Sequence, residues 1–125
     1  MVLVVAPKGR DAQLAAEALE RGGILVTVSR DLGEIAQHFT DETDALLIAE
    51  EALLPPQLPM LLNKLKRQPP WSDVPVIILT APGGGDRASA QALEVFGPTA
   101  NVSLLERPLR VVTMVAAVKA AMAPS

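Results

Sequence analysis

Short runs of Val, Ile, Leu and Ala recur along this chain of 125 residues, and segments with helical periodicity lie between them. The runs over 2–5, 45–49 and 74–79 contain no polar or charged residue. A strand without polar alternation is buried on both faces, which is typical of a parallel sheet. This pattern constrains the fold most, because strands that alternate with helices give right-handed crossovers and a layer of helices on each face of the sheet.

Two more strands and five helices complete the alternation. The segment over 24–29 alternates apolar and polar residues more than the other strands, so we expect it near an edge of the sheet, and the last strand covers 101–105. Helices are predicted over 10–21, 31–39, 55–68, 86–96 and 110–122. This order of elements predicts a flavodoxin-like, doubly wound α/β fold, with a five-stranded parallel sheet in the order 2-1-3-4-5 and five helices.

The length fits one domain over residues 1–125, and half of the residues are apolar. Three residues are aromatic, namely Phe39, Trp71 and Phe96, so the core has to be built from aliphatic side chains. The chain has no cysteine, which excludes disulfides and thiolate metal sites.

Charge and hydropathy exclude further classes of protein. The net charge is −3 and the pI is about 5.1, which argues against a protein that binds nucleic acid. No stretch reaches the roughly 18 apolar residues that a membrane-spanning helix needs. The N-terminus also lacks the basic start of a secretory signal. We therefore expect a cytoplasmic domain that makes no membrane contact.

In a sheet of this kind, ligands bind beyond the carboxyl ends of the strands, at the switch point between strands 1 and 3. The residues at those ends decide what the chain can do. They are Ala6, Pro7, Lys8, Ala49, Glu50, Glu51, Thr80, Ala81, Glu106, Arg107 and Pro108. Because adjacent residues at a strand end point apart, we expect Glu50 and Glu51 to be solvated rather than to form an acid–base pair.

Three segments at these ends resemble the receiver domain of two-component response regulators. They are VPVIILTA over 74–81, LLERPLR over 104–110 and DALLIAEEAL over 44–53. The likeness extends over the whole chain. It implies a phosphoacceptor Asp at the end of the third strand and an acidic pair after the first strand, which together hold Mg²⁺.

At these three positions the sequence departs from the family. The acidic pair corresponds to Ala6 and Pro7, and the phosphoacceptor, counted from Asp44, corresponds to Ala49. A methyl group cannot attack phosphorus, and Mg²⁺ has no oxygen ligand at these positions. We therefore expect no phosphorylation of an Asp, no bound metal, no cofactor and no enzymatic activity in this domain.

The remaining family positions are partly kept. Thr80 matches the family, Arg107 takes the place of a Lys and differs from it in geometry, and Leu104 takes the place of an aromatic switch residue. The chain thus resembles a degenerate pseudo-receiver. The segment QPPWSDVPVIILT over 68–80 also resembles the receiver-like modules at the N-terminus of multidomain sensor histidine kinases. This likeness implies a protein partner, either a kinase or another domain of a larger signalling protein.

Two other functions remain open. A shift of the alignment by one residue puts Glu50 at the acceptor position, where it would either mimic the acyl phosphate or accept a phosphoryl group. Alternatively, the domain would sense a small ligand or nucleotide at the strand ends, with Lys8, Arg10, Thr80 and Arg107 as anion contacts.

The last two predicted helices are rich in alanine, beyond what one buried stripe requires. The alanines are Ala88, Ala90, Ala92, Ala116, Ala117, Ala120 and Ala121. Small exposed side chains let helices approach closely, and receivers commonly pair through helix 4, strand 5 and helix 5. We therefore expect a homodimer through that face.

Overall fold

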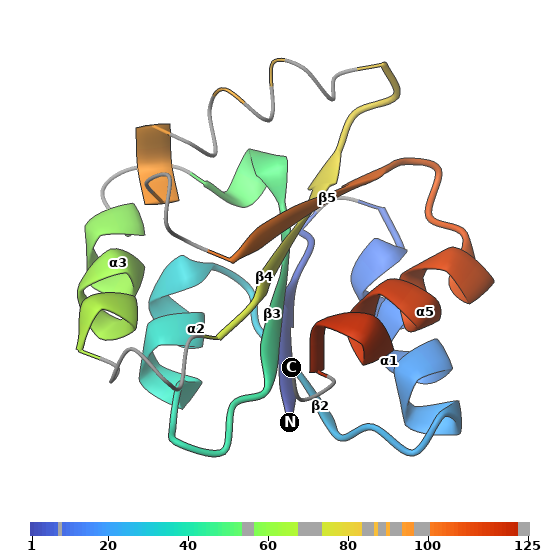
Figure 1. Cartoon of the computed structure of the whole chain (residues 1–125), viewed down its shortest axis with the longest axis horizontal. Coiled ribbons are helices and arrows are strands. Elements are labelled where there is room, and N and C mark those ends of the chain that lie inside the picture. Colours follow the sequence, from blue (N-terminus) through green and yellow to red (C-terminus); the bar gives the residue numbers. More distant parts are fainter. Residues whose placement is uncertain are drawn as a thin grey trace.

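The computed structural model of the chain describes residues 1–7, 9–53, 57–67, 74–83, 87, 90, 94–96 and 101–122. Its centre is one parallel sheet of β1 (Val2–Val5), β2 (Val26–Val28), β3 (Ala45–Ala49), β4 (Val76–Thr80) and β5 (Val102–Glu106). The strand order is β2-β1-β3-β4-β5 (Figure 1). The predicted flavodoxin-like sheet and its order are confirmed, including the position of the second strand at an edge.

Helices alternate with the strands in the predicted order. They are α1 (Asp11–Arg21), α2 (Leu32–His38), α3 (Leu58–Lys66) and α5 (Val111–Met122), with a short 3-10 turn, η1 (Glu50–Ala52). Residues 87, 90 and 94–96 are helical where the fourth helix was predicted, and the rest of 86–96, with Ala88 and Ala92, lies outside the described residues. Within the part of the chain described, no helix combines the length and apolar character needed to cross a membrane.

The helices form a layer on each face of the sheet. α1 and α5 cover one face, and α2 and α3 cover the other (Figure 1). Successive residues of β1 point to opposite faces, so Val2 and Val4 pack in the cluster under α1 and α5, whereas Leu3 and Val5 pack in the cluster under α2 and α3. Burial on both faces explains why the central strands are continuously apolar.

Local signals set the helix ends. The Asp31 carboxylate accepts a hydrogen bond from the Glu34 backbone N–H at 2.9 Å, which caps the N-terminus of α2 and lowers the pKa of Asp31. α1 ends before Gly22 and Gly23, and Gly23 has a φ of +84°, which favours glycine. β2 and α3 are shorter than predicted, since the residues just outside Val26–Val28 and Leu58–Lys66 are not part of these elements.

α5 is apolar nearly all the way round. Met114 and Val118 are buried against the sheet, whereas Val112 is 83 % exposed and Ala116 and Ala120 are exposed on the outer side. Lys119 is the one charged residue of this helix. Apolar surface on both sides is typical of a helix that packs against something on each side.

Candidate functional site

The carboxyl ends of β1 and β3 form the apolar half of the candidate site. Val5 of β1 pairs with Ile48 of β3, so Ala6 and Ala49 follow at neighbouring strand ends. Ala6 is 5 % exposed and Ala49 is fully buried, and both belong to the hydrophobic cluster that packs under α1 and α5. These two strand ends are therefore a continuation of the hydrophobic core.

These residues do not fit a magnesium ion. Ala6, Pro7 and Ala49 offer no side-chain oxygen, which is the ligand that Mg²⁺ requires. The described residues also contain no group of three or more His, Cys, Asp or Glu side chains placed to hold a metal ion. Metal-assisted phosphoryl transfer at these strand ends is therefore not supported by the residues present.

Arg107, directly after β5, is the centre of an ionic half of the site. Its Nη1 donates a hydrogen bond to Glu51 Oε2 at 2.9 Å, and its Nη2 donates to Glu51 Oε1 at 2.6 Å. Its Nε donates to Asp11 Oδ2 at 2.8 Å. The guanidinium thus binds Glu51 in a bidentate manner and Asp11 by a third bond, an arrangement that a lysine cannot reproduce. We call these three side chains the arginine clamp.

The arginine clamp is largely shielded from water and links three parts of the chain. The three side chains are between 16 and 23 % exposed. The hydrogen bonds to Glu51 raise the pKa of Arg107, with Asp11 adding to the effect and burial opposing it. The backbone N–H of Arg107 also donates to the Thr80 carbonyl oxygen at 2.9 Å. The start of α1, η1 and the segment after β5 are held together at this one residue.

Glu50 makes a separate contact at the same edge of the sheet. Its Oε1 accepts a hydrogen bond from the Ala81 backbone N–H at 3.0 Å, just beyond β4. The expectation that Glu50 and Glu51 are both solvated is therefore wrong. They do point apart, but each finds a partner, Glu50 the backbone after β4 and Glu51 the arginine of the clamp.

Two further candidate residues, Thr80 and Leu104, lie on β4 and β5. Thr80 is fully buried, and its Oγ1 has no hydrogen-bond partner in the part of the chain that the structure describes. Leu104 is half-buried and packs against the cluster under α2 and α3. An aliphatic side chain in this place cannot donate a hydrogen bond as an aromatic hydroxyl can.

The cations proposed as anion contacts do not form one site among the described residues. Lys8 lies outside these residues, Arg10 is exposed at the start of α1, and Arg107 is engaged by two carboxylates. Sequence reasoning also missed Asp11 and Glu51 as partners of Arg107. A usable signal was present, since an acid soon after strand 1 and another soon after strand 3 both approach the edge where the cation after strand 5 must lie.

Comparisons with known proteins agree with this architecture. No protein-family model matches the chain, and no curated protein matches it either. A response regulator receiver domain protein from Clostridium thermocellum superposes with a TM-score of 0.72 at 22 % identity, covering 97 % of this chain and 92 % of that one.

Two further solved structures are similar over almost their whole length. A response regulator receiver domain protein from Bacillus halodurans has a TM-score of 0.70 at 23 % identity, with 99 % of this chain and 97 % of that chain covered. A sensor protein from Polaromonas has a TM-score of 0.68 at 15 % identity, with 97 % and 94 % covered. The chain therefore has the fold of response regulator receiver domains.

Proposed function

We propose that this chain is a regulatory module of two-component signalling that acts as a pseudo-receiver, binding a protein partner without phosphorylation of an Asp. The receiver fold supports the signalling context. The apolar strand ends at Ala6 and Ala49 support the absence of Asp phosphorylation. The module would work in the cytoplasm as part of, or beside, a sensor histidine kinase, and would have no catalytic activity of its own.

The arginine clamp is the observation that carries this proposal. Phosphoryl transfer to a receiver requires a nucleophilic oxygen and cations that neutralise the transferred group. Ala49 supplies no oxygen, and the cation that would face the phosphoryl group already binds Glu51 and Asp11. A carboxylate pair on Arg107 does electrostatically what an acyl phosphate would do, with negative charge supplied by the chain itself.

A fixed arrangement of the site has a consequence for signalling. The clamp joins α1, η1 and the start of the segment that leads into α5, and those are elements that a phosphate-dependent switch would have to move. Because carboxylates of the chain itself bind Arg107, we expect the module to present the same surface whether or not a phosphoryl donor is present. Regulation would then come from whether the partner is bound.

The two alternatives receive less support from the geometry. Phosphorylation of Glu50 would break its hydrogen bond to Ala81 and add a dianion at a place where Arg107 is already neutralised. An anion-sensing site would need an available cation, and Arg107, the strongest candidate among the described residues, is engaged. The pseudo-receiver proposal needs neither rearrangement.

A homodimer through the fourth helix, β5 and α5 is part of the proposal. The exposed side of α5 supports it, because Val112, Ala116 and Ala120 form an outer row at intervals of four residues with no charge. Light scattering at high micromolar concentration should give the mass of a dimer, and Val112→Glu should shift it toward the monomer. A monomer in both cases would refute pairing of the isolated domain.

Intact-mass spectrometry after incubation with acetyl phosphate and Mg²⁺ tests the absence of phosphorylation. We expect no gain of a phosphoryl group, whereas a receiver with an intact Asp in the same tube should gain one. A gain on this chain would overturn the proposal. If Glu50→Gln then abolished the gain, the unconventional acceptor would be identified.

A further inference from the structure

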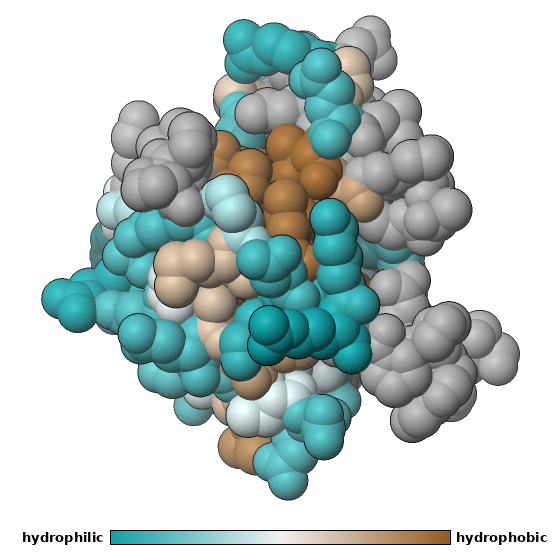
Figure 2. Space-filling model, turned by 90° about the vertical axis from the view of Figure 1, so that its left-hand side faces the viewer, coloured by the Kyte–Doolittle hydropathy of each residue, from teal (hydrophilic) through white to brown (hydrophobic). Residues whose placement is uncertain are grey.

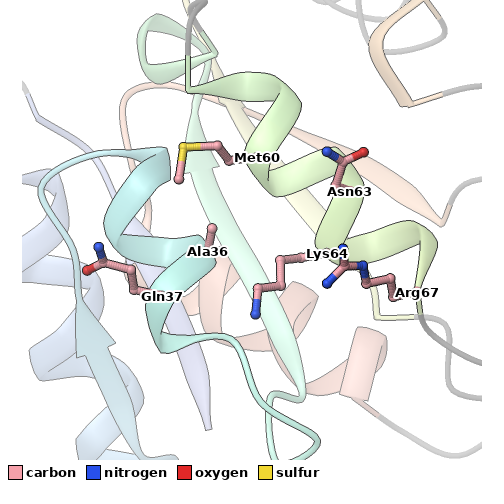
Figure 3. A pocket seen from close by; sticks show the side chains of 6 residues that line it. All are labelled: Ala36, Gln37, Met60, Asn63, Lys64 and Arg67. Carbon is pink, nitrogen blue, oxygen red and sulfur yellow. The ribbon is translucent and has the colours of Figure 1, made fainter.

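A groove lies between α2 and α3, away from the strand ends. Its volume is about 280 Å³, and it is lined by Ala36, Gln37, Met60, Asn63, Lys64 and Arg67 (Figure 3). The side of the molecule that carries α2 and α3 shows apolar surface among hydrophilic side chains (Figure 2). None of the groove residues belongs to the arginine clamp, so this is a separate surface.

One stripe of α3 supplies most of the groove. Met60, Lys64 and Arg67 are spaced by four and three residues, which places them on the same side of the helix. Lys64 reaches from α3 toward α2, and Met60 lies at the other end of the groove (Figure 3). Met60 is 48 % exposed, whereas Ala36 is 3 % exposed and forms the floor. The groove therefore combines an apolar floor with a cationic end.

The charge of this groove contrasts with the charge of the chain. The net charge is −3, yet α3 contains no acidic residue and carries Lys64 and Lys66, followed by Arg67. No salt bridge joins Lys64 or Arg67 to a carboxylate in the described part of the chain. Cations in the last turn also complement the helix dipole. Both Lys64 and Lys66 lie in the last turn, but only Lys64 also lines the groove, together with Arg67.

We propose that this groove docks an acidic amphipathic helix of the protein partner. An apolar side chain of the helix would lie against Met60 and Ala36, and its carboxylates would pair with Lys64 and Arg67. The proposal rests on the proposed function, in that it names the surface through which the module binds protein. It goes beyond that function by fixing the chemistry of the partner.

Shape favours a helix over a small ligand. Small-molecule sites enclose most of their ligand and usually measure about 300–1,000 Å³. This groove lies at the lower end of that range and is open, and its walls are two helices. An open channel between two helices, with an apolar floor and charge at one end, suits the helix-in-groove mode of recognition. Complementary charge would fix the orientation of the bound helix and speed its association.

The test uses two synthetic peptides and the ¹⁵N-labelled chain. One peptide has Leu at alternating intervals of three and four residues, flanked by Glu, and its sister has Gln in place of every Glu. We expect the acidic peptide to give saturable amide shifts centred on Ala36, Met60 and Asn63, with binding that weakens as salt is added. The Gln peptide should bind about tenfold more weakly.

Matched variants locate the charge. Lys64→Glu together with Arg67→Glu should weaken binding of the acidic peptide about tenfold or more, whereas Lys66→Glu should change it by less than about twofold. All three side chains are exposed, so the variants should fold, and the amide spectrum reports this directly. If Lys66→Glu weakened peptide binding as much as the double variant does, specific docking in the groove would be refuted.

Other outcomes separate this proposal from the proposed function. Absence of saturable shifts with the acidic peptide, or shifts confined to another face, would overturn the groove but leave the pseudo-receiver proposal intact. Saturation at the same residues by pyrophosphate alone, without the peptide, would make the groove a small-anion site and would also overturn it. A gain of a phosphoryl group by mass would overturn the proposed function whatever the groove binds.

Discussion

Two parts of the sheet edge formed by the carboxyl ends of the strands differ in chemistry, since one is apolar and the other is ionic. At β1 and β3, Ala6 and Ala49 are buried in the hydrophobic core. A short distance along the same edge, Arg107, Glu51 and Asp11 form an ionic network. In a receiver, one set of acids and one cation would face a common centre. In this chain Ala6 and Ala49 stand at the ends of β1 and β3, and Glu51 and Asp11 bind Arg107.

The difference shows what each half requires of the chain. A half-buried cation needs compensating charge, because removing it from water without a partner costs free energy. Alanine at a strand end needs only a close-packed environment. Glu51 and Asp11 supply the compensating charge for Arg107. The following four changes test this comparison, from the largest expected effect to the smallest.

Ala49→Asp puts a carboxylate into the apolar half. We expect a loss of about 3 kcal/mol in the free energy of unfolding, because the charge is buried without a partner. Urea denaturation measures it. Ala49→Asn is the control for size, and it should cost less since the amide carries no charge. If Ala49→Asp were as stable as the parent chain, Arg107 would be available to a carboxylate there, and the two halves would not be independent.

Arg107→Ala removes the centre of the ionic half. Two carboxylates that are only 16 and 23 % exposed lose their cation, so we expect a loss of about 2 kcal/mol, with Arg107→Lys losing about 1 kcal/mol. The lysine keeps the charge but not the bidentate bond. Denaturation curves for both variants give the ranking. An unchanged stability for Arg107→Ala would mean that the network contributes nothing.

Glu51→Gln and Glu50→Gln compare neighbours with different partners. Glu51 binds a guanidinium through two bonds, whereas Glu50 accepts one bond from a backbone N–H. We expect a loss of about 1.5 kcal/mol for Glu51→Gln and below about 0.5 kcal/mol for Glu50→Gln. A double-mutant cycle with Arg107→Ala should show coupling to Glu51 and none to Glu50. The reverse order would shift the centre of the site to Glu50.

Thr80→Val is expected to have the smallest effect. The Thr80 hydroxyl is buried and makes no hydrogen bond among the described residues, so replacing it with a methyl group of similar shape should change stability by between about 0 and +1 kcal/mol, in the stabilising direction. Thermal denaturation is sufficient to detect this sign. A loss of stability would reveal a partner for the hydroxyl and hence a polar connection between the two halves.

The sequence is a good guide to the fold because the strong signals are local. Continuous apolar runs such as 45–49 predict buried parallel strands, and the helical pattern over 31–39 predicts α2; both predictions are confirmed. The apolar character of the site was equally accessible, since Ala6 and Ala49 follow strands that are easy to locate. The burial of alanine at a strand end can be predicted without knowing any specific side-chain contact.

The ionic half could not be predicted in the same way, because its contacts join residues far apart in the chain. Asp11 and Arg107 are separated by 96 positions, and Glu51 and Arg107 by 56. The carboxyl ends of parallel strands lie at one edge of the sheet, so all three residues are expected there. This does not predict which acid binds Arg107. The direction of each side chain decides which acid binds: Glu51 reaches the guanidinium with both oxygens, whereas its neighbour Glu50 points to the backbone N–H of Ala81.

The most direct test of the central claim is an amide NMR titration of the ¹⁵N-labelled domain with Mg²⁺ and beryllofluoride, the mimic of an acyl phosphate. A pseudo-receiver with an occupied Arg107 predicts no saturable shifts at Ala49, Thr80 and Arg107. Saturable shifts at these three amides would contradict the account, because they would show that a carboxylate of this chain binds the mimic and that the arginine clamp opens to admit it.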